Sequence, residues 1–131
     1  MSAEKLDFEK FLAEYRDFQQ EHPSFGEIFI LSSTGGLEFC SPADYCTEAE
    51  AQVLLDSWQN HGSAAVIGED RYPIISWEEL QFAARNVRGK GALIGCKTKS
   101  DRYVVIHLLP GAKDGPTTAA IKLNRWSWQI I

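Results

Sequence analysis

The chain has 131 residues, of which 44% are hydrophobic and 24% are charged, and its formal net charge is −5. These values are typical of one globular domain that is large enough to bury its own core, so we expect a single domain over residues 1–131. They exclude a general nucleic-acid-binding protein, because the balance is acidic, and a membrane span, because no apolar run approaches about 18 residues.

The first predicted element is a helix over residues 5–21. Its aromatic and aliphatic side chains recur at helical spacing, namely Phe8, Phe11, Leu12, Tyr15 and Phe18. The helix should end at His22, because the following Pro23 disfavours helical backbone in the residue before it. For residues 1–10 we leave two states open, an ordered helix start and a frayed or flexible extension.

Two strands are then expected over residues 27–33 and 37–41, joined by a glycine-rich turn. Thr47 and Glu50 have the spacing of a capping box, which predicts that a second helix begins there. The buried stripe of this helix would consist of Ala51, Leu54, Leu55 and Trp58. Residues 64–68 and 71–76 predict a hairpin of short strands.

Residues 76–86 are ambiguous, because Ser76 and Glu79 make a second capping-box pattern. A short helix, an ordered loop and a strand all remain open for this segment. Two further strands are predicted over 92–99 and 102–109. The second is almost continuously apolar, as expected for a strand covered on both faces. A last helix should run from Pro116 to about residue 126, with Asp114 in its N-cap region.

Consecutive strands joined by short turns predict a central antiparallel β-sheet. Helices before, between and after the strands would cover both faces of that sheet. The fold class expected from the residues is therefore α+β.

Charge is strongly segregated along the sequence. Residues 84–113 contain seven basic residues and one acid, a charge of +6, whereas residues 1–60 contain twelve acids and three bases, a charge of −9. We expect one basic and one acidic face, of which the basic face would steer an oppositely charged macromolecule. A solvated β-surface without a partner is the alternative.

Recognisable catalytic chemistry is missing from the sequence. There is no phosphate-binding glycine loop or nucleophile motif, and no histidine or cysteine has metal-ligand spacing. We therefore expect no catalytic residue, no metal and no cofactor. His107 is expected to be a satisfied core histidine and Cys96 a buried structural cysteine. The three cysteines cannot all pair with one another and the N-terminus is too charged for a signal peptide, which indicates a reducing, cytoplasmic compartment.

Several stretches, in this order, resemble the profilins, the small actin-monomer-binding proteins, and their departures resemble the archaeal, Asgard-type branch. The stretches are GEIFILSSTGGLEF (26–39), VLLDSW (53–58), RYPIIS (71–76), GALIGCKTKSDRYVVIHLLP (91–110) and AAIKLNRW (119–126). The resemblance implies a central antiparallel sheet with the N- and C-terminal helices on one face and a further helix on the other.

The resemblance also implies a partner, monomeric actin or an actin homologue, and a cytoskeleton-associated, monomeric regulator of actin nucleation and polymerisation. The actin-binding residues that it implies are Trp58, Arg71, Arg85, Arg88, Lys90, Lys97, Lys99, Lys113, Thr117 and Lys122. Profilins also bind phosphoinositides with such basic residues. The basic segment leaves this open here, while the net negative charge argues against strong membrane attachment.

Proline-rich segments are the other ligands of the family, held in an aromatic groove between the first and last helices. The tryptophan–tyrosine pair that is usual in the first helix is replaced here. The residues that could form the groove instead are Phe8, Phe11, Tyr15, Phe39, Trp126 and Trp128. The resemblance therefore predicts weak or no binding of proline-rich segments, and a core role for these rings is the alternative.

Two other classes of protein combine such a sheet with flanking helices. One is the small-GTPase-associated scaffold of the roadblock or longin type, which stable homodimerisation would favour. The other is a ligand-sensing domain of the PAS type, which would need an internal pocket and a bound small molecule.

Overall fold

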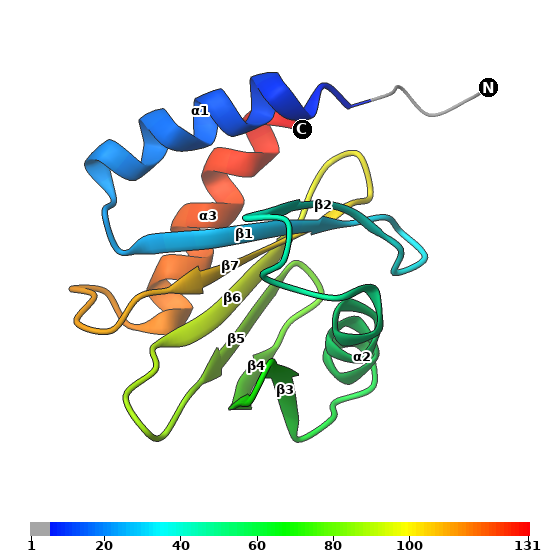
Figure 1. Cartoon of the computed structure of the whole chain (residues 1–131), viewed down its shortest axis with the longest axis vertical. Helices are drawn as coiled ribbons and strands as arrows, with labels where there is room; N and C mark the ends of the chain where they lie inside the picture. The colour runs from blue at the N-terminus through cyan, green and yellow to red at the C-terminus, as the bar shows by residue number, and fades with distance from the viewer. Residues whose placement is uncertain (1–5) are drawn as a thin grey trace.

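The structure is a computed structural model that describes residues 6–131 (Figure 1). Seven strands form one curved sheet in the order β2-β1-β7-β6-β5-β4-β3, and every neighbouring pair is antiparallel. The elements are α1 (Phe8–Glu21), β1 (Phe25–Leu31), β2 (Leu37–Ser41), α2 (Glu48–Gln59), β3 (Ala64–Ile67), β4 (Asp70–Trp77), β5 (Gln81–Arg85), β6 (Ala92–Lys97), β7 (Tyr103–Leu108) and α3 (Pro116–Ile130). The expected α+β architecture is confirmed.

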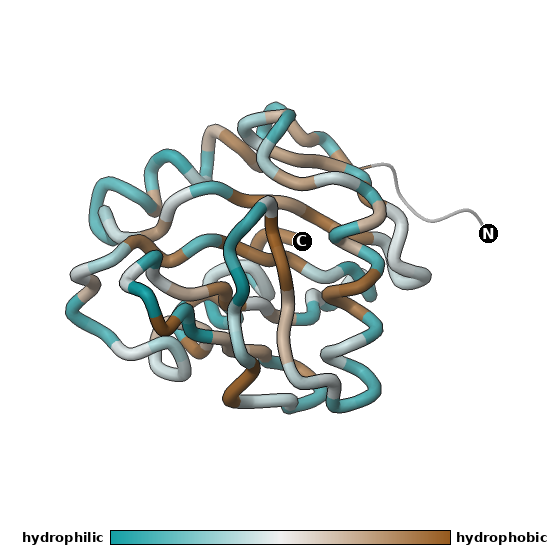
Figure 2. The backbone as a smooth tube through the Cα atoms, turned by 60° about the horizontal axis from the view of Figure 1, so that its bottom comes forward, coloured by the Kyte–Doolittle hydropathy of each residue, from teal (hydrophilic) through white to brown (hydrophobic). Residues whose placement is uncertain are grey.

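Two cores lie on opposite faces of the sheet. One contains Phe11 and Tyr15 of α1 with Leu123 of α3, and the other contains Leu54 and Trp58 of α2. The strands between them alternate, so that neighbouring residues of β6 and β7 contribute to different cores. The terminal helices therefore cover one face and α2 the other, as the resemblance implied (Figure 1). Figure 2 shows the hydrophobic stretches of the backbone gathered in the strands and the hydrophilic ones mostly in the connections.

The capping box predicted for α2 is present. Thr47 Oγ1 accepts from the backbone N–H of Glu50, and the Glu50 carboxylate accepts from the backbone N–H of Thr47. The same carboxylate also accepts from the backbone N–H of Gly68, which lies in the turn between β3 and β4. One side chain thus fixes both the helix start and its neighbouring hairpin.

Helix α1 begins later than the sequence predicts. Its N-cap is Asp7, whose carboxylate accepts from the backbone N–H of Lys10 over 3.1 Å, so helical backbone starts at Phe8 and not at residue 5. Residues 8–10 are therefore ordered helix. The prediction of a frayed extension over residues 1–5 lies outside the described residues.

The ambiguous segment 76–86 forms neither a helix nor a loop. Residues 76 and 77 complete β4, a tight turn follows, and Gln81–Arg85 form β5 inside the sheet. Phe82, Ala83 and Ala84 are fully buried between the two helical layers, so strand pairing overrides the local capping pattern.

The ends of three other elements also differ from those predicted from the sequence. β1 starts at Phe25 because that residue pairs with Leu108, and β6 ends at Lys97 because residues 98–102 form a turn. The last helix continues to Ile130, four residues beyond the prediction, and its N-cap is Gly115. Asp114 instead forms an ion pair with Lys122.

Candidate protein-binding surface

Part of the sheet is left uncovered on the side of the terminal helices. Helix α3 lies over β5 and β6, whereas the outer faces of β3 and β4 are open (Figure 1). Tyr72 and Ile74 belong to the α2 core, so Arg71 and Ile75 point to the opposite, uncovered side. Ile75 is 50% exposed. Val66 of β3 pairs with Arg71 of β4 and is exposed as well.

One flank of α3 borders this open sheet. Thr117, Ile121 and Trp128 are exposed and share that flank with Asn124, because their spacing brings them to one side of the helix. The Asn124 amide donates to the carbonyl oxygen of Lys97 over 3.2 Å, which fixes the flank towards β5 and β6. Two large apolar side chains, Ile121 and Trp128, are therefore exposed on the flank of α3 that lies over β5 and β6.

The loop between β5 and β6, residues 86–91, closes one end of this surface. Asn86 holds the loop: its Oδ1 accepts from the backbone N–H groups of Arg88 and Lys90, at 2.8 and 3.1 Å. A groove of about 820 Å³ separates the loop and the ends of β4 and β5 from the segment that leads into α3, and Arg85, Val87 and Lys113 are among its lining residues.

We call this region the arginine face. Its cationic members come from β4, β5, the following loop and the segment that leads into α3, and its apolar members are exposed residues of β3, β4, the loop and α3. It consists of Arg71, Arg85, Arg88, Lys113, Thr117, Val66, Ile75, Val87, Ile121 and Trp128. An apolar centre with an arginine rim is the composition of a protein-binding surface.

Lys97 and Lys99 lie away from the arginines of this face, at the end of β6 that Asn124 and the last turns of α3 adjoin. Arg85 pairs with Ala92 at the start of β6, whereas Lys97 ends that strand, roughly 17 Å farther along at strand spacing. Lys97 points to the α2 side, with its Nζ 3.7 Å from Asp101 and 6.0 Å from the centre of the Tyr103 ring. One contiguous basic segment of sequence therefore forms two separate basic groups.

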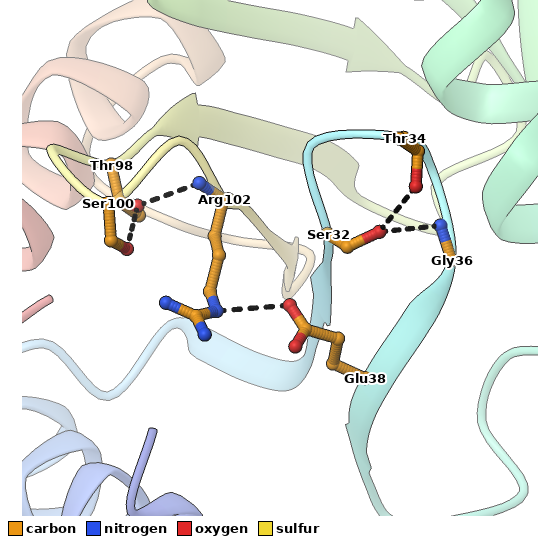
Figure 3. A network of polar contacts seen from close by, with 7 residues as sticks. All are labelled: Ser32, Thr34, Gly36, Glu38, Thr98, Ser100 and Arg102. Carbon is orange, nitrogen blue, oxygen red and sulfur yellow. Dashed lines mark hydrogen bonds and ion pairs between the residues drawn. The ribbon is translucent and has the colours of Figure 1, made fainter. Parts of the chain in front are cut away.

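Lys99 is part of a turn rather than of the strand on which the resemblance placed it. The Thr98 hydroxyl contacts the Ser100 hydroxyl and accepts from the backbone N–H of Arg102 (Figure 3). Arg102 reaches Glu38 of β2 with a 3.0 Å contact, and a second hydroxyl-bonded turn, Ser32 to Gly36, lies beside it (Figure 3).

Trp58 is a core residue. It is 3% exposed, its ring packs on those of Phe82 and Tyr103, and its Nε1 donates to the carbonyl oxygen of Glu78 over 2.7 Å. Only its edge lines a small hollow that Lys97 shares. It supports the surface near α2 and offers little area to a partner.

Lys122 and Lys90 differ from the other predicted contacts. The ammonium of Lys122, in the middle of α3, is already paired with Asp114, and its side chain is half-exposed. Lys90 is exposed, and its carbonyl oxygen is bound by the ring of His107.

The aromatic residues between α1 and α3 pack mainly on one another. Phe8 stacks on Phe39 with a centroid distance of 5.2 Å, and Trp126 contacts both Phe11 and Tyr15. Phe11 and Tyr15 are fully buried, so most of the ring faces serve the core. Burial raises the pKa of the Tyr15 phenol above its ordinary range, and its hydroxyl donates to the carbonyl oxygen of Gly26.

Trp128 does not join this cluster. It is 43% exposed on the flank of α3 that borders the sheet, because two residues along a helix turn a side chain to nearly the opposite side. Its place is therefore on the arginine face and not in an aromatic groove with Trp126.

His107 is a polar link that the sequence did not reveal. Its Nδ1 lies 3.0 Å from Glu27 Oε1, and its Nε2 lies 2.6 Å from the carbonyl oxygen of Lys90. The sequence pattern predicted a satisfied core histidine. Both ring nitrogens have a contact and the ring is mostly buried, but the two partners come from β1 and from the β5–β6 loop, which are far apart in sequence.

The cysteines are free thiols, and Cys96 is fully buried as expected. Burial raises its pKa to about 12, although the Ser127 hydroxyl 3.0 Å away opposes the shift. Within residues 6–131 no group of histidine, cysteine or acidic side chains is arranged to hold a metal ion. The helices of the same described part are too short or too polar to cross a membrane.

The relatives of the chain decide its family. No family model matches it. Loki profilin-3 from Lokiarchaeum sp. (strain GC14_75) is 30% identical over 88 residues, which make up 66% of this chain and 72% of that protein. The chain belongs to the profilin family. This membership decides against the roadblock or longin scaffold and the PAS-type sensor.

Solved profilin structures share the fold. The profilin in the LokiProfilin2/Rabbit Actin Complex superimposes with a TM-score of 0.78 at 14% identity, covering 94% of this chain and 96% of that one. LokiProfilin1 gives 0.77 at 16% identity, with 93% and 95% covered. Profilin IA of Acanthamoeba castellanii gives 0.63 at 19% identity, with 85% and 90% covered. The similarity therefore spans the archaeal and the eukaryotic profilins.

Proposed function

We propose that this profilin binds monomeric actin, or an actin homologue, through the arginine face and thereby regulates actin nucleation and polymerisation. The observation that carries the proposal is the uncovered outer face of β3 and β4, which exposed Ile75 and Arg71 share. Two Loki profilins, including one with a TM-score of 0.78 to this chain, form complexes with rabbit actin.

The composition of the face suits a large protein partner. Ile75, Ile121 and Trp128 supply apolar area that water leaves on binding, and arginines form planar, well-directed hydrogen bonds to carboxylates. The surrounding positive charge would attract an acidic surface, mainly by raising the association rate.

The mechanism is steric. A protein that covers one end of an actin monomer prevents the contacts needed for nucleation while the other end remains free to join a filament. No catalysis and no cofactor are needed. We further propose that residues 1–131 form a single domain and that the protein is a monomer. It would act in the cytoplasm in association with the cytoskeleton.

Two further ligand classes follow from the same residues. The cationic members of the arginine face make phosphoinositide headgroups possible ligands, in competition with actin. Proline-rich segments should bind weakly or not at all, because the rings between α1 and α3 pack on one another.

The test is the rate of spontaneous assembly of rabbit actin at increasing concentrations of this protein, at low and at physiological salt. Dose-dependent slowing of nucleation that weakens with salt is expected. An unchanged nucleation rate at tens of micromolar protein would contradict the proposal for this actin, and the same assay with an archaeal actin would then decide it for a homologue.

A further inference from the structure

We propose that His107 and Glu27 form a proton-dependent clasp that fixes the β5–β6 loop, residues 86–91, and so makes actin binding pH-dependent. The inference rests on the proposed function for its consequence, but the clasp itself is a property of the free protein.

Both ring nitrogens of His107 face hydrogen-bond acceptors. Nδ1 is 3.0 Å from a carboxylate oxygen of Glu27, and Nε2 is 2.6 Å from the carbonyl oxygen of Lys90. A neutral imidazole has one N–H and can donate to only one of them. Both contacts are hydrogen bonds only when the histidine–carboxylate pair carries one more proton than neutral imidazole and carboxylate together.

The two tyrosines that contact the His107 ring do not take part in this proton exchange. The ring of Tyr45, from the segment before α2, stacks on it at 6.1 Å, and that of Tyr72 on β4 meets its edge at the same distance. Burial, followed by the negative charge of Asp70, raises the pKa of Tyr72 to about 12. Burial also raises the pKa of Tyr45, so both phenols stay neutral. Glu27 is the carboxylate in contact with the ring, Asp70 acts electrostatically on the neighbouring Tyr45 and Tyr72, and Lys90 contributes its backbone carbonyl.

Loss of the proton leaves one contact without a hydrogen. Either Nδ1 faces the Glu27 carboxylate, or Nε2 faces the Lys90 carbonyl, with a lone pair against an oxygen. Because both contacts together bind one more proton than the released loop, lower pH stabilises the clasp and higher pH weakens it. Histidine is the side chain that ordinarily changes charge between pH 5 and 8.

The clasp is one of several contacts of the loop, whose two ends are joined by a hydrogen bond from the backbone N–H of Asn86 to the carbonyl oxygen of Gly91 over 2.9 Å. Asn86 fixes its start to β4 and binds the N–H groups of Arg88 and Lys90. Gly91 closes the loop with φ +88°, and a Cβ there would lie 2.1 Å from the carbonyl oxygen of Leu108. Among these contacts the clasp is the one whose hydrogen depends on pH, and it ties the end of the loop at Lys90 to His107 of β7 and Glu27 of β1.

The test compares the wild type with Glu27→Gln. A glutamine amide donates to Nδ1 of a neutral imidazole, whose Nε2–H then donates to Lys90, so E27Q should stay clasped without the extra proton. Glu38→Gln is the matched control, because it removes an equal charge and a carboxylate contact, that with Arg102, from the other end of the sheet.

Amide hydrogen exchange of Arg88 and Lys90 in the free protein is measured at pH 6 and pH 8 and corrected for intrinsic rates. In the wild type and in E38Q, protection should fall about tenfold on going to pH 8, the ratio that corresponds to a lost charge-assisted hydrogen bond. In E27Q it should not change. Equal protection of the wild type at both pH values, or a pH dependence of E27Q like that of the wild type, would overturn the clasp.

The consequence for binding is measured separately, as the affinity of wild type and E27Q for the same actin at both pH values. The ratio of the two affinities removes the pH dependence of actin itself, and it should favour E27Q several-fold at pH 8. A ratio of one at both pH values would overturn the coupling to actin. Absence of actin binding by both proteins would instead contradict the proposed function, and the exchange data alone would then decide the clasp.

Discussion

The side-chain amide of Asn86 donates a hydrogen bond to the backbone carbonyl oxygen of Arg71 over 2.8 Å. The bond joins the end of β5 to β4, and Asn86 is buried between them. Since its side-chain oxygen accepts from the N–H groups of Arg88 and Lys90, one side chain arranges three basic residues of this profilin.

Replacement of Asn86 by alanine should lower the free energy of unfolding by about 1–3 kcal/mol, because a buried carbonyl and two N–H groups lose their partner. Asn60→Ala is the control, since Asn60 is exposed and its side chain binds only Asp56, and it should cost less than about 0.5 kcal/mol. Urea denaturation measures both. Equal stabilities of the two variants would show that Asn86 does not organise the loop.

Thiol reactivity should separate the three cysteines. Burial raises the pKa of Cys96 and of Cys46 to about 12, whereas Cys40 is partly exposed and its pKa is raised by a smaller amount. At pH 8 a disulfide reagent should therefore label Cys40 first, because the thiolate is the reactive form. Mass spectrometry of the labelled peptides identifies the site.

Cys40→Ser is the control for this labelling and should remove the fast phase. Labelling of Cys96 in the folded protein at the rate of Cys40 would contradict its burial against Ser127.

Lowering the pH should decrease the free energy of unfolding, in part through protonation of Glu50. Partial burial opposes ionisation, but the N–H groups of Thr47 and Gly68 and the Thr47 hydroxyl outweigh it and hold the pKa of Glu50 below its ordinary value. A lowered pKa means stability that is present above the unfolded-state pKa and lost as pH falls through the folded-state pKa. Between pH 5 and pH 3 the wild type should therefore lose more stability than Glu50→Gln.

Thermal unfolding of both proteins across that pH range checks this expectation. If the difference in stability between wild type and E50Q stays constant from pH 5 to pH 3, the carboxylate is not the group that fixes α2 to the β3–β4 turn.

Local patterns predicted those elements that local chemistry fixes. The Thr47–Glu50 pair predicted the start of α2, and Pro116 predicted the start of α3. The ambiguous segment 76–86 shows the limit, because Ser76 and Glu79 satisfy a helix-start pattern that is irrelevant once Phe82, Ala83 and Ala84 are buried between neighbouring strands. Pairing within a sheet depends on residues far away in sequence.

The basic character of the candidate surface could be predicted from the sequence, but its location on the sheet could not. Arg85 and Lys97 belong to one basic segment, yet β6 carries the chain across the length of the sheet between them. Ile75 gave no signal in sequence and Trp128 was predicted for an aromatic groove, because the exposure of both depends on where α3 stops covering the sheet. The Glu27–His107 pair joins residues eighty positions apart and had no local signature.

The most direct test of the actin-binding proposal is the affinity for monomeric actin of two double variants with equal loss of charge, Arg71→Glu with Arg85→Glu and Lys97→Glu with Lys99→Glu. The account predicts that the first weakens binding at least about tenfold, as expected for arginines central to an interface, and that the second changes it less than about threefold. Equal weakening by both would show that long-range charge, rather than the arginine face, holds the partner. Stronger weakening by the lysine pair would place the actin site at the other end of β6 and contradict the account.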